Sequence, residues 1–133
     1  MAGLQVLEDT FANQGVHVLG VYRDDFGNQG GSEEQIEGCT GQYAVTFDQF
    51  ATDHVIDTDG AGPIVPQPVW EWLSQQQLYS SPDWNFHKYL ISRTGELVAY
   101  FPRSVYPGDD PANPNDSFDT NAVVVAIQAE IAK

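Results

Sequence analysis

The chain has 133 residues, of which 41% are hydrophobic and 12% aromatic, so it is long and apolar enough for one domain around a core. Its formal net charge is −14, from 19 acidic residues against five Lys and Arg, which makes nucleic acids and anionic membranes poor partners. The single cysteine, Cys39, excludes an internal disulfide and a multi-cysteine metal site.

The first half of the chain alternates helix, strand and helix signals. Residues 3–15, GLQVLEDTFANQG, have apolar side chains at helical spacing and end in a glycine, which predicts a helix. The apolar, β-branched run 16–22 predicts a strand covered on both faces. After the polar loop 23–31, Ser32 is a candidate N-cap of a second helix, whose end is weakened by two glycines, Gly38 and Gly41.

The second half predicts a short helix, a hairpin and a closing helix. Pro68 fits the first turn of a helix in QPVWEWLSQQQ. We expect one of Trp70 and Trp72 to pack inward and the other to lie at the rim, with an aromatic interface as the alternative. The runs FHKYLIS and ELVAYFP flank RTG and predict a β-hairpin that buries Phe86, Tyr89, Leu90 and Ile91. The final 16 residues, 118–133, predict a helix with Ser117 or Asp119 as its cap and with one apolar face, formed by Val123, Val124, Ile127 and Ile131.

This order of elements predicts one α/β domain over residues 1–133, with helices on the faces of a small sheet made of one strand and a hairpin. No membrane-length apolar run and no signal peptide are visible, so we expect a soluble, cytoplasmic protein. The acidity has two explanations, a saline or extracellular setting, or charge that keeps a soluble protein dispersed.

The stretch PDWNFHKYLI places Trp84 and Asn85 directly before a strand. Both side chains carry hydrogen-bond donors that need partners when covered, so the pair is either satisfied structure or part of a site. Three stretches, VLGVYRDDFGNQGGSEEQI, GCTGQYAVTFDQF and WNFHKYLISRTGELVAYF, together resemble the glutathione peroxidase family, thiol or selenol peroxidases with a thioredoxin-like fold. The resemblance runs in order over most of the chain and leaves out the proline-rich loop before the last helix.

The resemblance implies an active site in which a Cys or selenocysteine is assisted by Gln29, Trp84 and Asn85. Such donors stabilise a thiolate without adding a competing base. The thiolate attacks a hydroperoxide and becomes a sulfenic acid, which a second thiol reduces. The resemblance implies no cofactor and no metal.

The resemblance also implies that the peroxidatic residue would fall a few residues before Met1, together with an N-terminal hairpin and the central strand between HVLGVY and KYLIS. We therefore expect this chain to be inactive alone, either as part of a longer peroxidase or as a remnant without peroxidase chemistry. In the second case it would be a non-catalytic, acidic thioredoxin-like binding module.

Cys39 resembles the resolving cysteine of thioredoxin-dependent members, and a buried inert cysteine is the alternative. The loop YRDDFGNQ departs from the family by placing Arg23, Asp24 and Asp25 before Phe-Gly, which makes the approach to the site more acidic. A thioredoxin-like protein or glutathione is the expected reductant, and the scarcity of basic residues favours the protein dithiol.

Two further motifs are weaker. DTDG at 57–60 has the first spacing of a calcium-binding loop, but Pro68 occupies the twelfth position, which favours a tight turn. The three histidines, His17, His54 and His87, are scattered, which predicts satisfied or exposed side chains rather than metal ligands.

Overall fold

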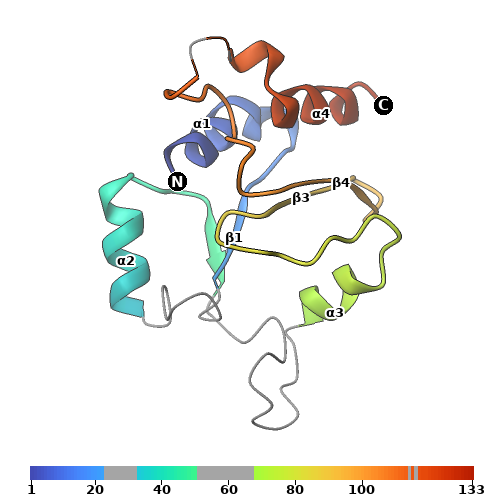
Figure 1. The fold of residues 1–133 in the computed structure, drawn as a ribbon, viewed down its shortest axis with the longest axis horizontal. Coiled ribbons are helices and arrows are strands. Elements are labelled where there is room, and N and C mark those ends of the chain that lie inside the picture. Colours follow the sequence, from blue (N-terminus) through green and yellow to red (C-terminus); the bar gives the residue numbers. More distant parts are fainter. Residues whose placement is uncertain (23–32, 51–67, 114, 116) are drawn as a thin grey trace, which may run out of the picture.

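The computed structural model describes residues 1–22, 33–50, 68–113, 115 and 117–133. Its helices and strands are, in chain order, α1 (Ala2–Phe11), the 3-10 helix η1 (Ala12–Gln14), β1 (Leu19–Val21), α2 (Glu33–Gln42), β2 (Asp48–Phe50), α3 (Pro68–Ser74), β3 (Lys88–Ile91), β4 (Leu97–Phe101), the 3-10 helix η2 (Phe118–Thr120) and α4 (Ala122–Ile131). Figure 1 shows α1 and α4 together on one side of the strands and α3 on the other. A mixed α/β architecture is therefore confirmed, and it is consistent with a thioredoxin-like fold.

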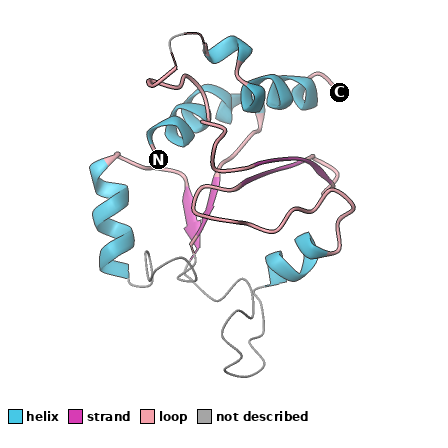
Figure 2. Cartoon of the chain, viewed as in Figure 1, coloured by secondary structure: helices cyan, strands magenta, loops and turns pink. Residues whose placement is uncertain are grey.

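The strands in the described residues form two separate pairs. β1 pairs with β2 in parallel, with Val21 opposite Phe50. β3 pairs with β4 in an antiparallel hairpin, with Lys88 opposite Phe101. Figure 2 shows both pairs near the middle of the fold. No strand is predicted at β2, and the expectation of one sheet from a single strand and a hairpin is therefore wrong for the described part of the chain.

The hairpin separates two apolar clusters because successive side chains of a strand point to opposite faces. On one face, Leu90 packs against a cluster of α1 and α4, and on the other face Tyr89 packs against α3. The first cluster is built from Leu7, Phe11, Val123, Val124 and Ile127, and the second from Trp70, Leu73 and Leu97. The expectation that one of the two tryptophans packs inward and the other lies at the rim is confirmed, and the structure shows that Trp70 is the buried one and Trp72 the half-buried one.

A buried glutamine connects α1 to the segment that leads into β2. The Gln5 side-chain amide donates to Asp9 Oδ1 and to Thr46 Oγ1, both at 2.8 Å, and its oxygen accepts from the Thr46 backbone N–H at 2.8 Å. All of its strong hydrogen-bonding groups are used, as a buried carboxamide requires. This arrangement fixes where β2 begins, beside β1, although the strand itself contains only three residues.

Several local predictions need correction. Asn121, rather than Ser117 or Asp119, caps α4, because its Oδ1 accepts from the Val123 N–H while its amide donates to the Tyr106 carbonyl. β1 is shorter than predicted and Leu19 is 57% exposed, so this strand is not covered on both faces. Phe86 and Ile91 are 51% and 40% exposed, contrary to the burial expected of them. The loop 23–31 and the motif DTDG lie outside the described residues.

Candidate functional site

The predicted pair Trp84 and Asn85 lies in a turn that enters β3. Trp84 is 44% exposed and Asn85 is half-buried. The next residue, Phe86, has φ of 63°, in the left-handed region that bulky residues rarely adopt. A strained backbone at this point turns the chain sharply before the hairpin and separates the two candidate donors from the regular strand.

Two cations lie beside this turn and were not singled out from the sequence. The Arg103 guanidinium carbon lies 5.6 Å from the centroid of the Trp84 ring, within the range of a cation–π contact. The Lys88 ammonium donates to the carbonyls of Phe86, Pro102 and Val105 at 2.7, 3.1 and 2.6 Å. Both contacts join the turn 84–86 to the loop 102–105. The only sequence signal for them is that basic residues are rare in this chain.

A pocket of about 150 Å³ opens between this turn and the start of α1. Its lining is mainly apolar, with the two cations at its wall, and comprises Met1, Leu4, Phe86, Lys88, Arg103, Tyr106 and Pro107. Burial lowers the pKa of Lys88 to about 8. The pocket is therefore a weakly cationic surface in a strongly acidic protein.

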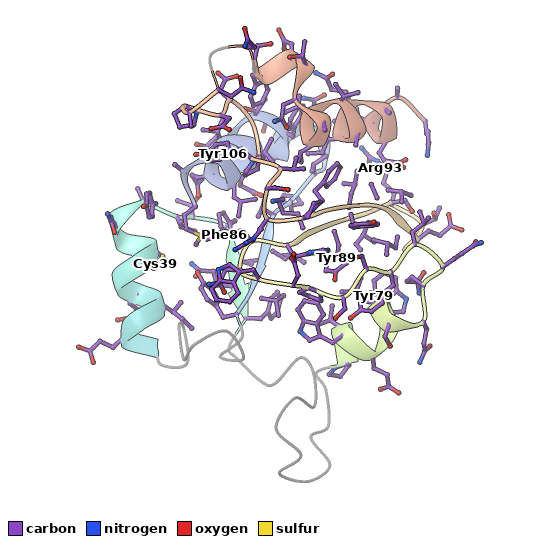
Figure 3. All side chains as sticks on the ribbon, in the orientation of Figure 1. Cys39, Tyr79, Phe86, Tyr89, Arg93 and Tyr106 are labelled. Atoms are coloured by element: carbon purple, nitrogen blue, oxygen red, sulfur yellow. The ribbon has the colours of Figure 1, made fainter. Side chains whose placement is uncertain are left out.

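Cys39 lies on α2 near the same end of α1 and is half-buried with a free thiol. Burial lowers the pKa of the Met1 amino group, and the charge of Cys39 opposes this shift. Burial raises the pKa of Tyr22 to about 12, and Cys39 adds to the rise. Met1 is thus a common neighbour of Cys39 and of the pocket that Phe86 lines, and Figure 3 shows Cys39 and Phe86 on the same side of the molecule as the start of α1.

His87 follows the turn and points into the protein, with a side chain only 4% exposed. Its ring is stacked on Tyr100 at a centroid distance of 5.7 Å and is tilted against Tyr89 at 4.9 Å. Neither ring nitrogen has a hydrogen-bond partner, and the nearest carboxylate oxygen, Asp83 Oδ1, is 3.7 Å from Nδ1. Burial lowers the pKa of His87 while Asp83 opposes this. The prediction that each histidine is satisfied or exposed is therefore wrong for His87.

Of the predicted site residues, Trp84 and Asn85 lie directly before Phe86, which lines the pocket at Met1, the charge of Cys39 acts on the Met1 amino group, and Gln29 lies outside the described residues. His54 also lies outside them. Within the described part of the chain, no group of three His, Cys, Asp or Glu side chains is arranged to hold a metal ion. No helix of that part is long and apolar enough to cross a bilayer.

Sequence comparisons place the chain beside known peroxidases, although no protein-family model matches it. It is 31% identical over 110 residues to a glutathione peroxidase of Lactococcus lactis, covering 79% of this chain and 66% of the relative. It is 29% identical over 111 residues to a glutathione peroxidase-like peroxiredoxin of Candida albicans, covering 78% and 63%. It is 33% identical over 109 residues to the glutathione peroxidase homolog BsaA of Halalkalibacterium halodurans, covering 78% and 66%. The chain thus spans slightly less than two thirds of the length of these curated relatives.

Proposed function

Since the chain belongs to the glutathione peroxidase family, we propose that it is part of a thiol peroxidase that reduces hydrogen peroxide or organic hydroperoxides with a thiol reductant. One observation carries the proposal beyond the family resemblance. Cys39, whose charge acts on the Met1 amino group, and Phe86, which directly follows Asn85 and lines a pocket with Met1, are both close to the start of α1, although they are more than 40 residues apart in the sequence. A reaction that uses both needs them on one side of the fold.

In the proposed reaction a peroxidatic thiolate attacks the O–O bond of the hydroperoxide. An S–O bond forms, the O–O bond breaks, and the leaving alkoxide takes up a proton as alcohol or water. The indole N–H of Trp84 and the amide of Asn85, with Gln29 as the third donor, would stabilise the thiolate and the departing oxygen. These groups donate hydrogen bonds to the sulfur but are not themselves bases. They therefore stabilise the thiolate without competing with it for a proton.

Cys39 is proposed as the resolving thiol. As a thiolate it would attack the sulfenic sulfur, forming a disulfide and releasing the sulfenic oxygen as water after protonation. An external dithiol then reduces the disulfide and returns both cysteines to the thiol state. The position of Cys39 on α2, a helix that contains Gly38 and Gly41, supports the local opening that such a step requires.

The peroxidatic residue of this proposal lies outside these 133 residues, because Cys39 is their only cysteine. We further propose that a strand leading to it lies between β1 and β3. Among the described residues, β1 pairs only with β2 and β3 only with β4, so each leaves one edge without a strand partner. Unpaired strand edges inside a domain are costly, which supports a further strand between them.

A protein dithiol of the thioredoxin type is the proposed reductant, in preference to glutathione. Glutathione carries two carboxylates that need cationic partners. In the described part of the chain, Lys88 is bound to three carbonyls, Arg93 donates to the Gln14 carbonyl, Lys133 pairs with Glu130, and Arg103 lies over the Trp84 ring. These side chains are poorly placed to bind a small anion, and a cytoplasmic location with its dithiol pool fits the proposal.

The test compares the 133-residue chain with a version extended by the coding sequence that precedes Met1. Peroxide consumption is followed through NADPH oxidation, with thioredoxin and its reductase in one series and glutathione and its reductase in another. We expect no turnover by the 133-residue chain and thioredoxin-dependent turnover by the extended chain. Trp84→Phe in the extended chain should lower kcat/KM, because the ring is kept while the N–H donor is lost.

The control for the resolving step is Cys39→Ser. It should abolish thioredoxin-dependent turnover in the extended chain but leave a single stoichiometric oxidation of the peroxidatic cysteine, detected by mass spectrometry. Failure of the extended chain to consume peroxide with either reductant would reject the proposal. An unrelated linker or stop codon before Met1 would also reject it and would favour the alternative, a non-catalytic acidic thioredoxin-like binding module that uses its open strand edges.

A further inference from the structure

Lys88 binds three backbone carbonyls from two different segments. Its ammonium donates to Phe86 in the turn before β3 and to Pro102 and Val105 in the loop after β4. A lysine ammonium has three N–H donors, so this set uses all of them. We propose that Lys88 is a positioning residue for Trp84, which it orients by clamping the turn 84–86 to the loop 102–105.

The turn needs such a clamp because its backbone is strained. Phe86 has φ of 63°, and a bulky residue keeps that conformation only where its surroundings determine it. The carbonyl of this residue is one of the three that Lys88 holds. Trp84 is two residues earlier and 44% exposed, so the conformation of the turn contributes to where its indole points.

The same clamp places Arg103 over the indole. Lys88 holds the loop at the residues on either side of Arg103, Pro102 and Val105, and the Val105 N–H also donates to the Pro102 carbonyl at 3.0 Å. This closed turn presents the guanidinium 5.6 Å from the centre of the Trp84 ring. Loss of the ammonium would leave the Val105–Pro102 bond in place but would detach this turn from the turn 84–86, and the cation would move away from the ring.

The surroundings of Lys88 make the clamp sensitive to its protonation. Burial lowers the pKa of Lys88 to about 8. The ion pairs between described residues do not include it, and the titratable or charged groups around it are the Met1 amino group, His87, Arg103 and Tyr106. A neutral amine has only two N–H donors, so deprotonation releases one of the three carbonyls.

The test uses NMR on the ¹⁵N-labelled chain, which has three tryptophan indole signals, with Trp84→Phe to assign the signal of interest. We expect Lys88→Met to shift the Trp84 indole signal while the Trp70 and Trp72 signals stay in place. Hydrogen exchange of the Val105 amide should accelerate roughly tenfold or more, as expected when a charge-assisted hydrogen bond that holds its turn is lost. Lys88→Arg should restore both, because a guanidinium also offers several donors.

The matched control is Lys133→Met, since Lys133 is the only other lysine and it pairs with Glu130 at the far end of the chain. A folded Lys88→Met protein with an unchanged Trp84 signal and unchanged Val105 exchange would overturn the proposal, as would Lys88→Arg behaving like Lys88→Met. If Lys88→Met does not fold, a titration of the unaltered chain decides. A Trp84 signal that follows the Lys88 midpoint supports the clamp, and a signal that stays constant while Lys88 titrates refutes it.

The importance of the clamp for catalysis rests on the role proposed for Trp84, but this experiment uses no peroxide. A failed peroxidase assay would leave the NMR result intact, and a failed NMR result would leave the peroxidase proposal intact.

Discussion

Replacement of Asn121 by alanine is expected to be one of the most destabilising single changes at a polar residue of this protein. Asn121 is 4% exposed and lies between η2 and α4. Its Oδ1 accepts from the Val123 N–H at 3.0 Å, and its Nδ2 donates to the Tyr106 carbonyl at 2.8 Å. One side chain therefore caps a helix and holds the loop that lines the pocket beside Trp84.

The magnitude follows from these two hydrogen bonds. Loss of an N-cap side chain costs about 1 kcal/mol, and a buried carbonyl left without its donor costs about 1 to 3 kcal/mol. Together they predict a loss of about 2 to 4 kcal/mol, a large fraction of the stability of an ordinary domain. The Tyr106 carbonyl is only partly buried, so its contribution lies toward the lower end of the range for a buried carbonyl.

The assay is urea unfolding followed by circular dichroism and tryptophan fluorescence. Asn121→Asp keeps the oxygen that accepts from the Val123 N–H but loses the N–H donor to the Tyr106 carbonyl. It should therefore lower the free energy of unfolding less than Asn121→Ala does. Asn13→Ala, at an exposed position in η1, is the control and should change the free energy of unfolding by less than about 0.5 kcal/mol. An Asn121→Ala loss as small as that of the control would refute the reasoning.

Two further predictions concern the core and the buried histidine. Val124→Ala should lower the free energy of unfolding by about 2 kcal/mol, because two buried methyl groups are lost and a cavity is left. Val125→Ala, on the exposed side of α4, is the control and should change the free energy of unfolding little. Urea unfolding measures both. Burial lowers the pKa of His87 in the folded protein below its ordinary value of 6.5. As the pH falls below 6.5, the unfolded chain therefore binds a proton at His87 more readily than the folded chain does. The stability that His87 contributes above pH 6.5 is lost as the pH falls through its folded pKa. His87→Phe keeps the stacking on Tyr100 and should flatten the fall of stability with acid; an unchanged slope would exclude His87 as its source.

Elements with strong local signals are well predicted from the sequence. α1 follows from apolar residues at helical spacing, and it continues into η1, which ends at Gly15 with φ of 78°. The hairpin follows from two apolar runs and from Gly95, whose φ of 80° a glycine adopts without strain. In each case the residues that determine the element lie within it.

Elements that depend on a distant partner are poorly predicted. β2 contains Asp48 and Gln49, which do not suggest a strand, and it is a strand because β1 lies beside it. The cap of α4 could not be chosen from residue type, because Ser117, Asp119 and Asn121 are all good caps. The Tyr106 carbonyl, 15 residues earlier in the chain, makes Asn121 the cap that also satisfies a second, partly buried group.

The candidate site divides in the same way. The amino-acid sequence determined the family and pointed to Trp84, Asn85 and Cys39, because side-chain chemistry and motif order are properties of the sequence itself. Only the tertiary structure decided that the start of α1 lies near both Cys39 and the tryptophan turn, and that Lys88 and Arg103 hold that turn. The partners of Lys88 are backbone carbonyls up to 17 residues away, which every residue carries, so no pattern of side chains could reveal them before the chain was folded.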